Sequence, residues 1–284
     1  MDDYFYKIKE KEFEEHIAPV LLAEDVAAIA EKFIVSECSK KGNLFKSLET
    51  PQKEYILNLC KKQDFVAIKP RIFGATTLLA CYLAGRLMAN SSKENYKSLV
   101  ILPNISMADE LWKKLRTIMT LYGVIYDVCY SHHMIVKDRS VKILSSKSDN
   151  LYTNLCSVMY DEIIFDEAAF IEKDIIDAVC LTTPDTRRVF ITTPSDKGVD
   201  FSKYVSENHI YQNIRWYELE RYQEFGLFFY KTEKMKKPTK EQIEAKLKDG
   251  WQICSKRYDE MKKLLGDKAI IELNDFIYGR KEKN

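Results

Sequence analysis

Residues 65–77 constrain the fold of this 284-residue chain more than any other stretch. An apolar run at Phe65–Ile68 ends at the sequence Lys-Pro-Arg, and a Gly-Ala-Thr-Thr corner leads into a second apolar run. This order predicts a buried strand, a tight loop and a helix. Such a loop can bind phosphate, because its backbone N–H groups and the helix N-terminus both point at the anion. The stretch therefore predicts an α/β domain with a phosphate-binding loop.

The loop departs at two positions from the usual phosphate-binding signature, G-x-x-x-x-G-K-[ST]. Lys69 stands where the first glycine belongs, and Ala75 stands where the lysine belongs. The main positive charge of the loop is therefore either missing or moved. Motifs elsewhere in the chain are needed to distinguish these alternatives.

Composition excludes several classes of protein. Hydrophobic residues make up 46% of the chain, which is ample for a packed core, and the net charge of +1 does not indicate a tight nucleic-acid binder. The seven cysteines contain no C-x-x-C pair, so free buried thiols fit better than disulfides or a zinc site. Neither an apolar run near 18 residues nor a secretory leader is visible, which argues against a membrane or secreted protein.

Further apolar runs predict the other strands of a mainly parallel sheet. Expected strands lie at 65–69, 98–103, 133–144 (a hairpin with a charged tip), 161–166 and 188–193. Residues 1–48 are expected to be helical, and a helix begins at Thr50-Pro51. Gln52 in that helix lies shortly upstream of the loop, where a glutamine can read the adenine edge of a nucleotide.

Asp166 and Glu167 follow the apolar strand predicted at 161–166. A carboxylate at the carboxyl end of a strand beside the loop strand is well placed to hold Mg²⁺. The next carboxylate can polarise a water molecule. The alternative is that these acids merely begin a surface helix. Their position behind a phosphate loop and a third apolar strand favours the chemical role.

The strand predicted at 188–193 ends in Thr192, Thr193 and Pro194. Ligand sites in parallel sheets gather at the carboxyl ends of the strands, so these hydroxyl groups would face the same ligand as Thr76 and Asp166. Taken alone, this sequence is also an ordinary strand exit. Beyond it, residues 201–230 are rich in aromatic side chains, for which core packing is favoured over base stacking.

The order of these segments resembles the ATPase domain of the large terminase subunit of tailed bacteriophages. The motifs that carry the resemblance are Pro51-Gln52, the loop R-x-x-G-x-T-T at 71–77, I-I-F-D-E-A-A-F at 163–170 and I-T-T-P at 191–194. The resemblance implies a three-layer, RecA-like P-loop NTPase of the additional-strand, catalytic-glutamate class, with a small helical C-terminal subdomain. It also implies ATP and Mg²⁺ as cofactors.

The resemblance implies a role for each matching residue. Glu167 would be the catalytic base, with Arg71 and Lys69 as catalytic cations. Thr76 and Asp166 would hold the metal, and the segment Thr192, Thr193 and Pro194 would couple hydrolysis to movement. Residues that would contact ATP are Gln52, Lys69, Arg71, Ile72, Phe73, Gly74, Ala75, Thr76 and Thr77. Arg139 is a candidate arginine finger, with Arg187 and Arg188 as alternatives.

Two hypotheses about turnover remain open. Some terminases carry the lysine at the start of the loop, as Lys69 does here, and its flexible stem could reach the β- and γ-phosphates. Alternatively, Ala75 leaves a nucleotide-binding assembly module that hydrolyses weakly or not at all. A helicase-like DNA translocase is a further alternative, although no second RecA-like lobe is visible after residue 200.

The expected division is an N-terminal helical segment (1–48), an ATPase core (49–200) and a C-terminal subdomain or linker (201–284). We expect no nuclease domain and no nuclease activity. The resemblance implies work in the host cytoplasm, with the chain docked transiently on a prohead in a homo-oligomeric ring. Its expected partners are double-stranded DNA, the portal protein and the small terminase subunit, with no membrane.

Overall fold

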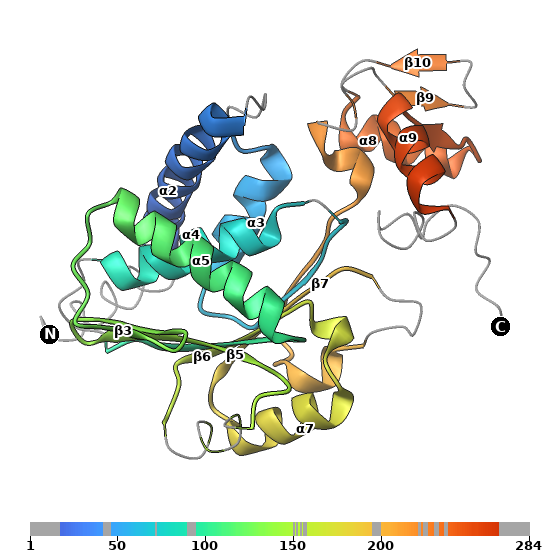
Figure 1. Cartoon of the computed structure of the whole chain (residues 1–284). Helices are drawn as coiled ribbons and strands as arrows, with labels where there is room; N and C mark the ends of the chain where they lie inside the picture. The colour runs from blue at the N-terminus through green and yellow to red at the C-terminus, as the bar shows by residue number, and fades with distance from the viewer. Residues whose placement is uncertain are drawn as a thin grey trace, which may run out of the picture.

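A computed structural model describes residues 18–41, 47–71, 73–89, 95–149, 151, 153, 155, 158–194, 200–220, 223, 227–229, 233–235 and 238–266. Its centre is an eight-stranded sheet in the order β3-β4-β5-β2-β6-β7-β1-β8 (Figure 1). The strands are β1 (Phe65–Ile68), β2 (Lys97–Leu102), β3 (Val128–Tyr130), β4 (His133–Val136), β5 (Arg139–Ser145), β6 (Glu162–Asp166), β7 (Arg187–Thr192) and β8 (Ile210–Asn213). From β5 to β8 every neighbouring pair is parallel, whereas β3 and β4 pair antiparallel.

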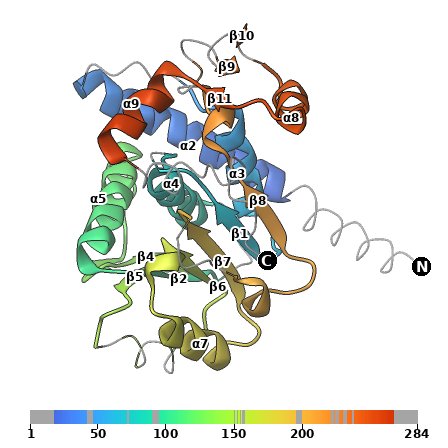
Figure 2. The same cartoon turned by 90° about the vertical axis from the view of Figure 1, so that its right-hand side faces the viewer.

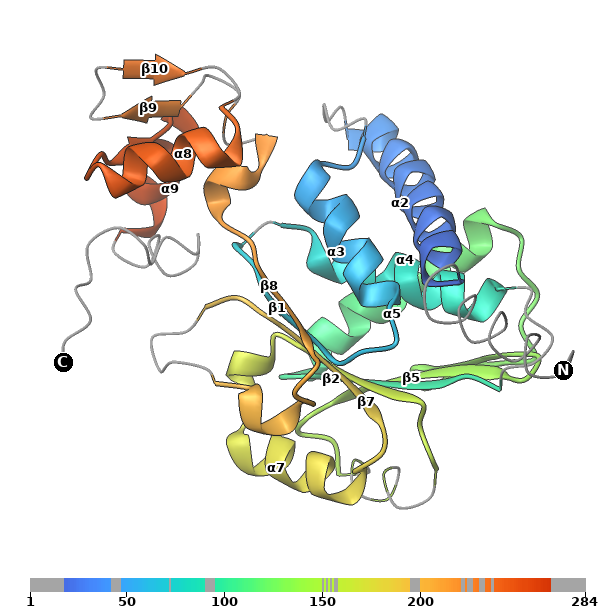
Figure 3. The same cartoon turned by 180° about the vertical axis from the view of Figure 1, so that it is seen from behind.

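Helices cover both faces of this sheet. One face carries α2 (Ala18–Lys41), α3 (Thr50–Cys60), α4 (Ala75–Met88) and α5 (Ile105–Leu121), and the other carries α7 (Lys173–Thr182) (Figure 3). Side chains alternate between two hydrophobic cores: Val100 and Ile164 pack on the first face, and Leu99 and Phe165 pack on the second. Burial on both faces explains why these strands are almost continuously apolar. The predicted three-layer fold is confirmed.

The helix after the loop is the centre of the first core. Most of α4 is buried, and α2 lies across it so closely that a Cβ atom at Gly85 would come within 2.8 Å of Val26 Cγ2. Glycine at this position therefore allows the close approach of the two helices. The packing fixes α4, and with it the loop that precedes it.

The strand predictions agree with the structure except at the ends of the sheet. The hairpin predicted at 133–144 is confirmed as β4 and β5. The sheet continues beyond the expected core boundary at residue 200, because β8 pairs with β1. β8 is short, and its burial varies from exposed Tyr211 to buried Gln212, so it lacks the apolar run of the inner strands. The sequence does not predict β3 either, because this strand has three residues and is only partly buried.

The C-terminal residues form a separate small unit on the same side of the sheet as α2 and α3 (Figure 2). It contains helices α8 (Lys240–Lys248) and α9 (Lys256–Leu265), as expected, but also an antiparallel sheet of β9 (Leu227–Phe229), β10 (Glu233–Met235) and β11 (Ile253–Cys254). Trp216 is fully buried and stacks on Tyr258 at 4.2 Å between ring centroids, which joins the end of the main sheet to this unit. Residues 1–17 and 42–46 of the N-terminal segment, and residues 267–284 of the C-terminal part, lie outside the described residues.

Among the described helices, none combines the length and apolar character that crossing a bilayer requires.

Candidate nucleotide site

The loop between β1 and α4 has the backbone of a phosphate-binding corner. Gly74 precedes α4 with φ of 91°, in the left-handed region that favours glycine, and its carbonyl accepts hydrogen bonds from Thr77 and Leu78. Because α4 then runs for 14 residues, its N-terminal N–H groups and dipole are available to an anion at the loop. Ala75 is buried, Arg71 is exposed, and Ile72 lies outside the described residues.

Gln52 ties this loop to α3. Its Oε1 accepts from the backbone N–H of Glu49 at 3.0 Å, and its Nε2 donates to the carbonyl of Phe73 at 2.8 Å. The side chain therefore caps a helix and supports the loop at the same time. Adenine recognition by Gln52 stays a prediction, and the structure adds this supporting role.

Asp166 lies at the carboxyl end of β6 and is completely buried. Its Oδ2 accepts a hydrogen bond from the hydroxyl of Thr76 at 3.2 Å, and its Oδ1 accepts one from the backbone N–H of Glu167 at 3.1 Å. Burial, and then the neighbouring charge of Glu167, raise the pKa of Asp166 to about 7. A bound cation would offset the unfavourable free energy of ionising this buried carboxyl group. A hydroxyl beside a carboxylate is a donor set that suits Mg²⁺. The residues present therefore fit the metal.

Glu167 points in a different direction from Asp166, toward β1. Its backbone is left-handed, with φ of 54°, which is uncommon for a residue other than glycine. Its carboxylate forms an ion pair with Lys69 Nζ. Thr193 holds the same carboxylate, because its N–H donates to Oε2 at 3.1 Å and its hydroxyl lies 3.2 Å from Oε1.

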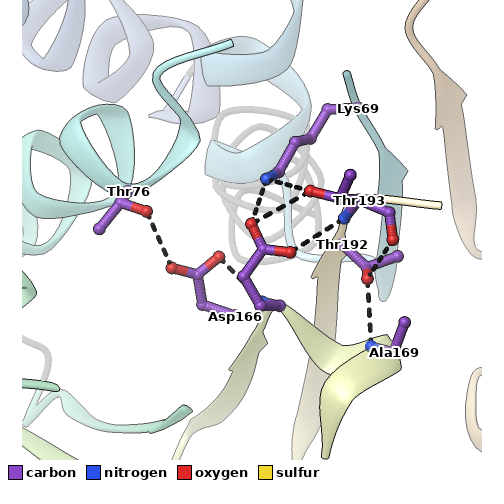
Figure 4. Close-up of polar contacts among 7 residues, drawn as sticks. Lys69, Thr76, Asp166, Ala169, Thr192 and Thr193 are labelled. Carbon is purple, nitrogen blue, oxygen red and sulfur yellow. Dashed lines mark hydrogen bonds and ion pairs between the residues drawn. The ribbon is translucent and has the colours of Figure 1, made fainter. Parts of the chain in front are cut away.

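The segment after β7 joins the neighbouring strands at the site (Figure 4). The hydroxyl of Thr192 donates to the carbonyl of Thr193 at 2.8 Å and accepts from the N–H of Ala169 at 3.1 Å. The carbonyl of Thr192 accepts from the N–H of Lys69 at 3.0 Å. The segment therefore contacts both the start of the loop and the residues after β6, and Pro194 follows as a buried residue.

The structure brings most of the predicted site residues to one edge of the sheet. Residues from β1, α4, β6 and β7 converge there (Figure 4). The sequence predicts phosphate as the partner of Lys69 and water as the partner of Glu167, and it does not predict the ion pair between the two side chains. The contact is possible because β7 alone separates β6 from β1 in the sheet. The residue pattern does not predict this strand order.

The structure contradicts the arginine-finger candidate Arg139. It is the first residue of β5, which runs parallel to β2, so it lies at the amino edge of the sheet, opposite the site. Its side chain is buried, and Nη1 donates to the carbonyl of Arg86 at 2.7 Å. The alternatives are also at the amino edge: Arg187 pairs with buried Glu162 at 2.6 Å, and Arg188 donates to backbone carbonyls.

The sheet order, the loop after β1 and the acidic end of β6 define a RecA-like, three-layer α/β fold. The crystal structure of the HK97 bacteriophage large terminase matches 89% of this chain with a TM-score of 0.58 at 17% sequence identity. The predicted resemblance to the terminase ATPase domain is therefore confirmed at the level of the fold. This chain spans 55% of the length of that terminase.

Two other solved structures match less of the fold. The large terminase ATPase domain of Thermus phage P74-26 has a TM-score of 0.47 at 13% identity, over 74% of this chain and 87% of that one. The yeast DEAD-box splicing factor Prp28 has a TM-score of 0.46 at 13% identity, over 60% of this chain and 46% of that one. No protein-family model and no curated protein matches the sequence.

Proposed function

We propose that this chain is an ATPase that binds Mg²⁺-ATP at the carboxyl edge of its sheet and hydrolyses it. One observation carries the proposal: two adjacent carboxylates, Asp166 and Glu167, lie beside the loop that turns at Gly74. Thr76 contacts the first carboxylate and Lys69 contacts the second. In this arrangement the two carboxylates have different partners. A hydroxyl group faces the first, and a cation faces the second, which suits them to different tasks.

The residues divide the work of phosphoryl transfer. Thr76 and Asp166 would hold Mg²⁺, which neutralises charge on the phosphate oxygens when bound. The loop N–H groups bind the phosphates, and Lys69 with exposed Arg71 supplies the cationic side chains that the signature lysine would otherwise provide. Glu167 accepts the proton of the attacking water. Ala75 takes no part in this scheme.

The segment at Thr192, Thr193 and Pro194 would couple hydrolysis to movement. Its support is the pair of contacts from Thr193 to the carboxylate of Glu167, together with the bond from Thr192 to Ala169 after β6. A change at Glu167 would therefore alter the end of β7 directly. This path runs through hydrogen bonds between adjacent strands.

We further propose that the ATPase drives packaging of double-stranded DNA into a viral prohead, as one subunit of a ring. The support is the likeness in fold to the HK97 large terminase, over 89% of this chain, together with the terminase-like order of the sequence motifs. Under this proposal the portal protein and the small terminase subunit are partners, and the host cytoplasm is the place of action. An arginine from a neighbouring subunit would complete the site, since Arg139 lies at the wrong edge.

A hydrolysis-impaired nucleotide-binding module is the second candidate function. The observation that favours it is the engagement of Lys69 with Glu167, which leaves neither residue on its expected partner. The lack of a lysine at position 75 points the same way.

An ATPase assay on the purified chain separates the two functions. We expect Mg²⁺-dependent hydrolysis that Glu167→Gln abolishes and that Glu172→Gln, a matched change at an exposed position, leaves intact. Hydrolysis only after Ala75→Lys would favour the impaired module. ATPase activity that survives Glu167→Gln would contradict the proposed mechanism.

A further inference from the structure

Tyr55, in the second turn of α3, carries a buried polar group without a partner. Its side chain is fully buried, and its hydroxyl forms no hydrogen bond with any described residue. An unpartnered hydroxyl in a protein interior is unfavourable, because the group loses its hydrogen bonds to water and gains none in return. Such a group needs an explanation, and a role at a functional site is one of the usual ones.

The ring of Tyr55 packs against the loop that follows β1. Its centroid lies 5.4 Å from that of Phe73 in the loop, and the two rings meet edge to face. Gln52, one turn earlier in α3, donates to the carbonyl of the same Phe73. After burial, the charges of Asp166 and then Glu167 contribute most to raising the pKa of the Tyr55 hydroxyl. The hydroxyl therefore lies within electrostatic reach of both carboxylates of the site.

A phosphate-binding loop needs hydrogen-bond donors on its protein side. In each peptide unit the N–H and the C=O point in opposite directions, so N–H groups that face an anion turn their carbonyls away from it, toward the protein. Gln52 supplies a donor to one such carbonyl, that of Phe73. The hydroxyl of Tyr55 is a second donor from the same helix, and no described residue accepts from it.

We propose that Tyr55 is a positioning residue of the nucleotide site: its hydroxyl donates to a backbone carbonyl of the loop when a phosphate group binds there. The inference rests on the proposed function, because the phosphate is that of the nucleotide. Binding of the phosphate then satisfies a buried donor in addition to the contacts of the loop N–H groups, and this favours the bound state. Tyr55 acts through the loop and contacts neither the phosphate nor the metal.

The alternative is that Tyr55 belongs to the hydrophobic core alone. Besides Phe73 it contacts Phe65, at 5.6 Å between ring centroids, and both contacts use only the ring. A phenylalanine would make the same two contacts without an unpartnered hydroxyl. Core packing therefore explains an aromatic residue at this position, but it does not explain a tyrosine.

Removal of the hydroxyl alone tests the proposal. Tyr55→Phe should raise the melting temperature of the free protein by about 2–4 °C, because it removes an unpartnered buried hydroxyl. The same variant should bind Mg²⁺ with a non-hydrolysable ATP analogue about tenfold more weakly, because the hydrogen bond to the loop is lost. Calorimetry on the full chain measures this affinity. A purely structural hydroxyl would not change stability and affinity in opposite directions.

Tyr160→Phe is the matched control. Tyr160 packs in the core on the other face of the sheet, and its buried hydroxyl also lacks a partner among the described residues. This variant should raise the melting temperature by a similar amount and leave the affinity for the nucleotide analogue unchanged.

The other results distinguish failure of this inference from failure of the proposed function. Wild-type binding that Tyr55→Phe does not weaken would overturn the inference and leave the proposed ATPase standing. A lower melting temperature for free Tyr55→Phe would also overturn it, since the hydroxyl would already have a partner without nucleotide. Equal losses of affinity in Tyr55→Phe and Tyr160→Phe would do the same, because the effect would not be specific to the loop. Absence of binding by the wild-type protein would contradict both proposals.

Discussion

The hydroxyl of Thr76 donates to Oδ2 of Asp166 across 3.2 Å, which joins the first turn of α4 to the end of β6. If these two oxygens hold Mg²⁺, Thr76→Val removes one ligand while it keeps the shape of the side chain. We expect Mg²⁺-dependent nucleotide affinity to fall about tenfold or more. Calorimetry with and without Mg²⁺ measures it. Thr117→Val, on the exposed face of α5, is the control, and equal affinities for both variants would refute the metal role.

Asp166 should make the nucleotide-free protein less stable as pH rises. Burial and the charge of Glu167 raise its pKa from 3.8 to about 7 in the folded state. Between these values the folded protein keeps a proton that the unfolded chain has released, so the contribution of this group to stability falls with increasing pH. We expect Asp166→Asn to stabilise the metal-free protein at about pH 8, and to stabilise it clearly less at about pH 5.

Thermal unfolding in a chelating buffer measures this difference. Asp185→Asn, which makes the same change at an exposed position, should shift the melting temperature equally little at both values of pH. A stabilisation by Asp166→Asn that is as large in acid as in base would show that the carboxylate is not the titrating group.

Thr193 should act on turnover by positioning Glu167. Thr193→Val removes the hydroxyl contact to Oε1 and the contact to Lys69, while the N–H contact to Oε2 remains. We expect kcat for ATP hydrolysis to fall about tenfold to a hundredfold, with KM much less affected. Thr193→Ser restores the hydroxyl and should recover most of the rate. A valine variant that turns over at the wild-type rate would rule out this positioning role.

Gln52 should support the loop in the absence of any nucleotide. Gln52→Ala leaves the buried carbonyl of Phe73 and the N–H of Glu49 without their side-chain partner. We expect the free energy of unfolding in urea to fall by about 1–3 kcal/mol. Gln63→Ala, at an exposed position, should change it little. Similar small changes for both variants would mean that the Gln52 contacts are incidental.

The inner strands could be predicted because burial on both faces demands continuous apolar runs. β2 and β6 are of this kind, and their predicted and observed bounds differ by a residue at most. β8 could not be predicted, since it lies at the edge of the sheet and alternates exposed and buried polar residues. Its pairing with β1 depends on where the chain returns after α7, which local pattern does not encode.

The site residues could be predicted because motifs at strand ends mark them, but their contacts could not. The sequence predicts that Arg139 lies at the charged tip of a hairpin. In the structure it begins β5, and its guanidinium is buried against the end of α4. Lys69 and Glu167 are 98 residues apart in the sequence, and only the strand order brings them together. A pairwise contact of this kind follows from topology and packing.

Hydrolysis by Lys69→Ala tests the central claim that Lys69 replaces the missing lysine of the loop. We expect kcat/KM to fall about a hundredfold to a thousandfold, since a cation on the transferred phosphate is lost. Lys97→Ala, at an exposed position at the start of β2, should match the wild type. Circular dichroism confirms that both variants fold. A folded Lys69→Ala protein that hydrolyses ATP at the wild-type rate would show that Lys69 does not replace that lysine.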